Sequence, residues 1–437
     1  MILDLSLKRK IEEAQYYSSP INQLYHPTAL FGVESKEIVY SWGNLNLTKF
    51  IPILLKEWFY LIKKDEFLVI DYIPNDICNS QKLEEYMEFL WKGKYKIIYH
   101  DFIDDYEFKN LNAEKIKNFI YKKERNVKKD KYLRFICQKI ISLKIPNDEI
   151  TKWTFGIITN GKRDHWVDKI IDSIKKQKIP SYEIIVCGNY EGKNGIIHIP
   201  FNINDDKGWI TRKKNLIVKR AKFENICMLH DRIVLGLNWY KGMKKWGNCF
   251  ENLGCKQLYE GIRVNDWIAS HYFIRNKNNE KFSFESYLDY KDWYPQVWFL
   301  GQLNIFKRSE IAKNNLWWNE NLFYGQREDF DFSLKLYQKG FIPRLNIFSE
   351  VETLTNKYVN PTFISYSLTS LNPKMKLNNK NAYLKAATYL LLKILGLIGI
   401  RLSFSALENI RGKIYTFILM FTPIKYSHNR EWKKVIK

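Results

Sequence analysis

The sequence predicts an α/β protein whose main part is a mostly parallel sheet flanked by helices. From Trp153 onward, short apolar strands alternate with amphipathic helices. Strands that are apolar throughout are typical of parallel sheets covered on both faces. A smaller α/β region precedes this sheet, and a basic helical tail follows it. We therefore divide the chain into residues 1–148, 149–358 and 359–437.

The composition predicts folded domains with anionic partners. The 437 residues exceed one average core, and 46% of them are hydrophobic. A formal charge of +23 indicates nucleic acid, an anionic membrane or phosphorylated substrates. Nucleic acid is not expected, because no helix-turn-helix, RNP-type or zinc-knuckle pattern occurs. The six cysteines lack metal-ligand spacing and Met1–Lys10 lacks an apolar signal segment, so we expect a cytoplasmic protein with reduced cysteines.

The first segment predicts a helix, a turn and a strand. An amphipathic helix over 50–61 leads through a polar turn, Lys63–Glu66, into the apolar strand Phe67–Tyr72, and a second strand is expected at Lys96–Tyr99. This succession resembles the later half of a nucleotide-type methyltransferase domain. No glycine-rich strand-to-helix loop occurs in the first 150 residues, so we expect a degenerate or accessory domain. Residues 109–144 are predicted to form a basic helical connector.

The second segment predicts four strands with helical crossovers. In open α/β sheets, ligands bind at the carboxyl ends of the strands, so the residues that follow each strand are the candidate site. The expected strands are Phe155–Thr159, Tyr182–Cys187, Ile196–Ile199 and Asn225–Leu229, with helices over 167–174 and 209–221.

Two of these strands end in polar motifs, Thr159-Asn-Gly-Lys-Arg163 and Leu229-His-Asp-Arg-Ile233. Between them, Ser173-Ile-Lys-Lys-Gln177 precedes Tyr182-Glu-Ile-Ile-Val-Cys-Gly-Asn189. In the order and spacing of these motifs, residues 152–345 resemble the family-2 glycosyltransferases of the GT-A fold. The resemblance implies a nucleotide-sugar donor and a divalent metal, Mg²⁺ or Mn²⁺.

The family's fourth strand ends in an Asp-x-Asp metal motif, which is His230, Asp231 and Arg232 in this chain. One carboxylate is left, so two outcomes stay open. Asp231, with His230, holds the metal on the donor diphosphate, or Arg232 supplies the positive charge itself. A third interpretation is a strand-end ion pair between Asp231 and Arg232.

Further donor-binding residues are implied by the same resemblance. Asn189 stands where many relatives have an aspartate that contacts the base, and Asp205 or Asp206 are alternatives, so the base stays open. A solvated basic face is the competing interpretation of the helix over 209–221. The implied donor-binding residues are Thr159, Gly161, Arg163, Asn189, Arg212, Asn215, Asp231 and Arg232, with Lys213 beside them.

Glu328 and Asp329 begin a short helix that Gly340 is expected to end. Their position matches the family's acidic pair near the acceptor, which implies that Asp329 is the catalytic base and that Glu328 orients the acceptor. The alternative is that both residues only complement the helix dipole. The buried stripe of this helix is expected to be Phe330, Ser333, Leu334 and Tyr337.

Two further features bear on the acceptor and on membrane binding: aromatic side chains before Gly301 and a basic C-terminal tail. Trp293, Tyr294 and Trp298 are candidates for stacking on the acceptor sugar or for the core. Residues 374–437 hold 13 Lys plus Arg against two Glu beside short apolar stretches. Such a tail lies on an anionic membrane or packs as a helical cap.

Together these features predict an inverting glycosyltransferase, peripheral at the inner face of the cytoplasmic membrane. Its acceptor is expected to be a glycan or lipid-linked molecule in the synthesis of surface polysaccharide or glycoconjugate. The alternative is a catalytically inactive, carbohydrate-binding protein of the same fold, which the missing second aspartate favours.

Overall fold

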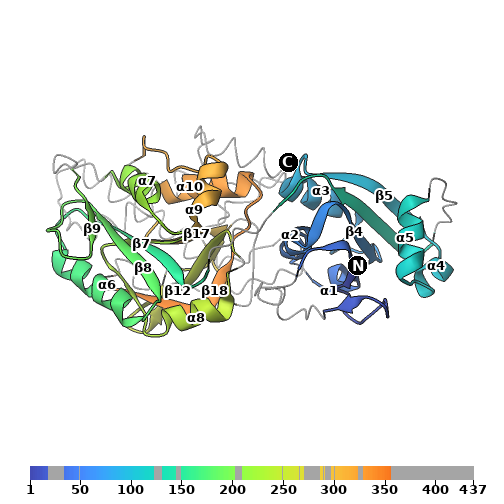
Figure 1. The fold of residues 1–437 in the computed structure, drawn as a ribbon, viewed down its shortest axis with the longest axis horizontal. Coiled ribbons are helices and arrows are strands. Elements are labelled where there is room, and N and C mark those ends of the chain that lie inside the picture. Colours follow the sequence, from blue (N-terminus) through green and yellow to red (C-terminus); the bar gives the residue numbers. More distant parts are fainter. Residues whose placement is uncertain are drawn as a thin grey trace, which may run out of the picture. The chain divides into compact units, whose positions relative to one another are not determined.

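The structure is a computed structural model with two large sheets (Figure 1). Residues 144–148, where the first predicted boundary falls, and the whole predicted tail lie outside the described residues. The structure describes residues 1–17, 34–48, 50–122, 130–143, 149–201, 209–248, 250–264, 266–269, 286–288, 290, 297–299, 301–322 and 328–355.

The first sheet has the strand order β2-β1-β3-β4-β6-β5 among the described residues. Strands β2, β1, β3 and β4 are parallel, and β6 runs antiparallel to both of its neighbours. The strands are β1 (Ile2–Asp4), β2 (Gln15–Tyr16), β3 (Lys36–Trp42), β4 (Ile62–Tyr72), β5 (Tyr95–Ile103) and β6 (Tyr132–Lys139).

Helices cover this sheet, and residues of α4 and α5 pack into its core beside strand residues such as Val69 and Ile136. Asparagine or aspartate side chains cap three of the helices, since Asn79, Asp104 and Asn112 each accept a backbone N–H of the first turn. The helices are α1 (Asn44–Leu47), α2 (Ile51–Tyr60), α3 (Ser80–Trp91), α4 (Asp105–Lys109) and α5 (Ala113–Tyr121).

The predicted helix and strands of this region are confirmed, and two other predictions are wrong. The polar residues 63–66 lie inside β4, which begins at Ile62 and bulges where Asp65 takes a positive φ of 64°. Residues 109–144 are not a helical connector, because they contain α5 and the buried strand β6. The interpretation as a degenerate methyltransferase-like domain stays a prediction.

The second sheet has the order β11-β18-β12-β17-β10-β7-β8-β9 in the described part of the chain, and β13 pairs with β12. The strands are β7 (Lys152–Ile158), β8 (Ser181–Cys187), β9 (Ile197–Ile199), β10 (Asn225–His230), β11 (Ile233–Leu235), β12 (Asn252–Tyr259), β13 (Ile262–Arg263), β17 (Leu303–Lys307) and β18 (Leu345–Thr353). Three short strands, β14 (Ile268–Ala269), β15 (Ser286–Tyr287) and β16 (Val297–Trp298), form a separate small sheet.

The α/β fold class and the parallel arrangement of the predicted strands are confirmed, because β9, β8, β7 and β10 pair in parallel. Antiparallel β17 extends the sheet beyond β10. The carboxyl ends of β7 and β10 are therefore neighbours, since Ile158 pairs with His230. This edge holds the predicted site.

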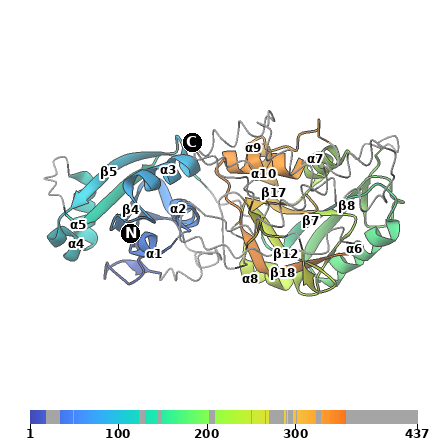
Figure 2. The same cartoon turned by 180° about the vertical axis from the view of Figure 1, so that it is seen from behind.

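Helices cover both faces of the second sheet. Figures 1 and 2 show α7, α9 and α10 on one face and α6 and α8 on the other. Each face has its own core, with Val167 and Trp239 in one, and Ile217 and Phe332 in the other. The helices are α6 (Asp164–Lys176), α7 (Ile210–Arg220), α8 (Trp239–Trp246), α9 (Arg308–Lys313) and α10 (Glu328–Gln338). In the described ranges, none of the helices has the length and apolar character needed to traverse a bilayer.

Candidate active site

The loops that follow β7 and β8 lie in backbone contact at the carboxyl edge of the sheet. Gly188 has a φ of 141°, and a Cβ there would lie 2.0 Å from the carbonyl oxygen of Thr159. A Cβ on Gly161 would lie 2.7 Å from the carbonyl oxygen of Asn189, whose own side chain is exposed. The two glycines thus bring three predicted donor-site residues, Thr159, Gly161 and Asn189, to one place.

Asp231 joins this group from the end of β10. Its carboxylate accepts hydrogen bonds from the Thr159 hydroxyl at 3.1 Å and from the Arg163 guanidinium at 3.3 Å. Arg232 does not make the ion pair that one interpretation assigned to it. Its guanidinium donates to Oε1 of Gln302 at 2.7 Å, and Gln302 in turn donates to Gln257 at 2.6 Å. Arg163 is therefore the cation that pairs with Asp231.

His230 is held neutral by its surroundings. Burial is the first cause that lowers the pKa of its imidazole well below the usual range, and the positive charges of Lys214, Arg232 and Arg163 are the next. Its backbone N–H donates to the carbonyl oxygen of Gln302 at 3.0 Å. Lys214, Arg232 and Arg163 therefore all lie near this strand end.

The predicted metal site at Asp231 and His230 does not fit a divalent ion in this arrangement. Both oxygens of Asp231 already accept hydrogen bonds, one of them from Arg163. Two further cations, Lys214 and Arg232, lie close enough to His230 to act on its charge, and a metal there would meet them. Across the described ranges, no group of three His, Cys, Asp or Glu side chains is placed to hold a metal.

Helix α7 directs two lysines into the site. The buried ammonium of Lys213 donates to the carbonyl oxygen of Thr159 at 3.0 Å. Lys214 is fully buried and donates to the carbonyl oxygen of Gly301 at 2.9 Å. Lys213 was predicted to face the donor, whereas the other two residues of this helix with that prediction, Arg212 and Asn215, lie elsewhere. Arg212 is exposed beside Trp209, and Asn215 bonds the backbone of Trp318.

The acidic pair begins α10, as predicted. Glu328 is 6% exposed and lies 3.5 Å from the ammonium of Lys214. Asp329 is partly buried, and its carboxylate accepts the backbone N–H of Gly301 at 3.1 Å. Burial, followed by the neighbouring charge of Glu328, raises the pKa of Asp329 to about 7. A carboxyl group with this pKa is suited to proton transfer at neutral pH.

Gly301 is the point where these groups meet. A Cβ on this residue would lie 2.5 Å from Oε1 of Glu328, 3.1 Å from Nζ of Lys214 and 3.2 Å from Cβ of Asp329. Its N–H and its carbonyl oxygen bond Asp329 and Lys214, respectively. The turn at Gly301 therefore fixes both carboxylates, and it has no space for a side chain.

The rest of α10 agrees largely with the predicted helix. Phe330, Ser333 and Leu334 are buried, whereas Tyr337 is half-buried. The Ser333 hydroxyl donates to the carbonyl oxygen of Asp329 at 2.8 Å and accepts the N–H of Phe299 at 3.2 Å. Gly340 ends the helix with a φ of 74°. Trp293, Tyr294 and the side chain of Trp298 lie outside the described residues, as do Asp205 and Asp206.

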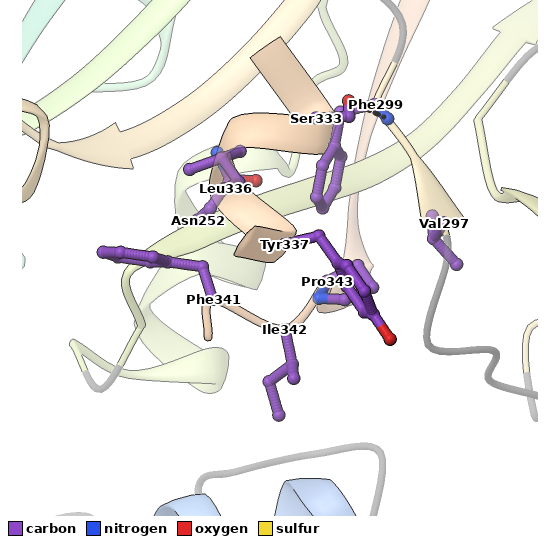
Figure 3. Close-up of a pocket in the computed structure, with 9 residues that line it drawn as sticks. All are labelled: Asn252, Val297, Phe299, Ser333, Leu336, Tyr337, Phe341, Ile342 and Pro343. Carbon is purple, nitrogen blue, oxygen red and sulfur yellow. Dashed lines mark hydrogen bonds between the residues drawn. The ribbon is translucent and has the colours of Figure 1, made fainter. Parts of the chain in front are cut away.

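A small cavity lies against the C-terminal half of α10 (Figure 3). Leu336, Tyr337 and Phe341 give it an apolar lining, and Asn252 adds a buried amide without a hydrogen-bond partner. Its volume of about 10 Å³ is close to the smallest that holds one water molecule. It is too small for a sugar or a nucleotide.

Sequence reasoning missed Lys214, Gln302 and Gln257. Lys214 stands in a basic run, Arg212-Lys-Lys-Asn215, which indicated a solvated or donor-facing helix surface. The signal that distinguishes it is spacing, because a residue four positions before the buried Val218 falls on the inner face of α7. The two glutamines carried no sequence signal.

Comparisons with known proteins complete the description. No protein-family model matches this chain, and no curated protein matches it. The solved structure of S. aureus TarS 1-349 is similar, with a TM-score of 0.33 and 11% identity over 65% of this chain and 79% of that one. The same fragment in complex with UDP-GlcNAc gives the same values. The structure of S. aureus TarS gives a TM-score of 0.34 and 10% identity over 65% of this chain and 48% of that one. Values this low assign no family, so the residues of the site carry the functional argument.

Proposed function

We propose that this protein is a glycosyltransferase that moves a sugar from a nucleotide-sugar donor to a hydroxyl group of an acceptor. One observation carries the proposal. The consecutive residues Gly301 and Gln302 hold a base and a cation side by side, because Gly301 bonds Asp329 and Gln302 bonds Arg232. A base for the attacking hydroxyl and positive charge for the departing diphosphate are the two requirements of this reaction.

In the proposed reaction, Asp329 removes the proton of the acceptor hydroxyl as its oxygen attacks the sugar. Its raised pKa of about 7 leaves a fraction of the carboxylate unprotonated at neutral pH while keeping it basic enough to accept a proton. Glu328, fixed by Lys214, orients the acceptor. We propose that the acceptor oxygen attacks the face of the sugar opposite the departing diphosphate, so that the transfer inverts the anomeric carbon.

The donor would lie at the carboxyl edge of β7, β8 and β10. Thr159, Gly161, Arg163 and Asn189 line this edge, together with Asp231 and Arg232. Ligands of open α/β sheets bind at such edges. We assign Arg212 and Asn215 a smaller role in donor binding, since Arg212 is exposed and Asn215 supports the turn at Trp318.

We further propose a glycan or lipid-linked acceptor in the synthesis of surface polysaccharide or glycoconjugate, at the inner face of the cytoplasmic membrane. The support is the surplus of basic residues in 374–437, which is suited to anionic headgroups. The division into an accessory region (1–148), a catalytic domain (149–358) and a basic tail (359–437) belongs to the same proposal.

The direct test is release of nucleoside diphosphate from a panel of nucleotide sugars that includes UDP-GlcNAc, UDP-glucose and GDP-mannose. We expect release from at least one donor. Asp329→Asn is expected to lower the rate at least about a hundredfold, the scale of a lost general base. Asp331→Asn is the matched control, because Asp331 lies in the same helix turn and pairs with Lys335 at 2.9 Å. Equal loss in both variants would contradict the assignment of the base.

The second candidate function is a catalytically inactive, carbohydrate-binding protein. The pairing of Asp231 with Arg163 favours it, because that carboxylate is already occupied. Such a protein would bind nucleotide or sugar without releasing nucleoside diphosphate from any donor. Binding without release is thus the result that would replace the first proposal by the second.

A further inference from the structure

The carboxylate of Asp231, which was expected to hold a metal, already forms an ion pair with Arg163. Asp231 is 8% exposed, and its oxygens accept from Thr159 and Arg163. A divalent ion on this carboxylate would meet the positive charge of the Arg163 guanidinium, which lies 3.3 Å from Oδ1. Mg²⁺ sites of this type depend on one or two free carboxylates plus the substrate phosphates.

Cations gather around this point instead. Arg163 leaves 36% of its side chain exposed while it bonds Asp231, and its guanidinium lies 4.8 Å from the ring centroid of Trp166. Arg232 is partly buried and is oriented by Gln302. Beneath them, Lys213 bonds the carbonyl oxygen of Thr159. Two accessible guanidinium groups and a buried ammonium thus surround the ends of β7 and β10.

We infer that fixed cations replace the divalent metal at this site, with Arg163 and Arg232 binding the donor diphosphate and Lys213 adding charge below Thr159. The inference rests on the proposed function. Guanidinium groups bind phosphate oxygens through two parallel hydrogen bonds and stay charged at every physiological pH. Each one already has a protein partner that holds it in place, Asp231 for Arg163 and Gln302 for Arg232.

The step balances without a metal. The bond between the anomeric carbon and the diphosphate oxygen breaks, and its electron pair stays on that oxygen. The acceptor oxygen forms the new bond to the anomeric carbon, and its proton passes to Asp329. The arginines stabilise the negative charge that collects on the diphosphate, which is the contribution that a metal makes in other enzymes.

Calorimetry with the full chain tests the inference, using inorganic pyrophosphate and UDP as probes. We expect binding in EDTA, and addition of Mg²⁺ or Mn²⁺ is expected to change the affinity by less than about threefold. Arg163→Met is expected to weaken binding about tenfold or more, as for a lost charge-assisted pair. Arg220→Met is the matched control, because Arg220 is exposed at the end of α7, outside the site. Binding that appears only with metal would overturn the inference.

Asp231→Asn separates the two mechanisms further. A metal site loses its ligand in this variant, so probe binding would be lost. Fixed cations lose a competing negative charge, while the amide oxygen of the Asp231→Asn variant can still accept a hydrogen bond from Arg163 and hold it in place, so pyrophosphate binding in EDTA is expected to stay equal or to become tighter. If Asp231→Asn misfolds, the metal titration of the unmodified chain still decides the question.

The release assay then separates failure of this inference from failure of the proposed function. Release of nucleoside diphosphate in EDTA, lost in Arg163→Met, supports both. Release that requires Mg²⁺ or Mn²⁺ overturns the fixed-cation inference and keeps the glycosyltransferase. No release from any donor with or without metal sinks the glycosyltransferase, and EDTA-resistant pyrophosphate binding would then mark an anion site without catalysis.

Discussion

Replacing Gly301 by alanine is expected to impair the acidic pair directly. The new Cβ would lie 2.5 Å from Oε1 of Glu328, whereas ordinary contact begins at 3.4 Å. Glu328 or the turn must therefore move by about 0.9 Å, and Lys214 and Asp329 limit the directions in which either can move. A misplacement of about 1 Å near the reacting groups costs about a hundredfold in rate.

The assay for Gly301→Ala is nucleoside diphosphate release under saturating donor, with circular dichroism and melting temperature as checks of the fold. We expect a rate about a hundredfold lower with the fold retained. Gly192→Ala is the control, because a Cβ on Gly192 would meet nothing within 4 Å. A Gly301→Ala rate within about threefold of the unmodified chain would show that the chemistry does not depend on this turn.

Four further predictions concern Asp329 and three other parts of the chain. Because the pKa of Asp329 rises from 3.8 to about 7 on folding, this group costs stability as pH increases across that window, so Asp329→Asn should raise the melting temperature more at pH 8 than at pH 5. An equal change at both values would contradict the raised pKa. Arg134→Met removes the guanidinium that neutralises the buried carboxylate of Asp71 at 2.7 Å, and leaves it only the Tyr40 hydroxyl among its side-chain partners, so the change should cost about 3–5 kcal/mol in urea unfolding. A cost below about 1 kcal/mol would contradict the role of this buried ion pair. Asn252→Leu should stabilise the fold by about 1–3 kcal/mol, because neither amide atom has a hydrogen-bond partner. Destabilisation would indicate a bound water in the neighbouring cavity. Removal of residues 374–437 should abolish binding to anionic vesicles, at about 1 kcal/mol per basic residue, and unchanged co-sedimentation would favour a packed cap.

The sequence predicted the parts of the fold that local patterns encode. The strands β7, β8 and β10 are mostly apolar, and a polar motif lies at or just after the end of each. Because parallel strands end at one edge, the contact between Thr159 and Asp231 follows from the strand order. The position of Asp329 in a first helical turn follows likewise from the stripe of α10 and from Gly340.

Local sequence patterns did not predict which distant strands and side chains pair with one another. Strand β6 inserts between β4 and β5, and a strand's neighbours depend on the whole sheet rather than on its own residues. Lys214 is buried beside its partner Glu328, which lies 114 residues away in the sequence. Arg232 is oriented by Gln302, which lies 70 residues away. Charged residues are normally assigned to the surface, and a distant partner is what reverses that expectation.

The measurement that tests the central claim most directly is the pH dependence of nucleoside diphosphate release from pH 5 to 9. Asp329 must lose its proton to act as base, so kcat/KM is expected to rise as pH increases through about 7 and then to level off. In Asp329→Asn, the residual rate should lose this rise. A profile that is flat across pH 7 in the unmodified chain, or that keeps the same rise in Asp329→Asn, would contradict the account.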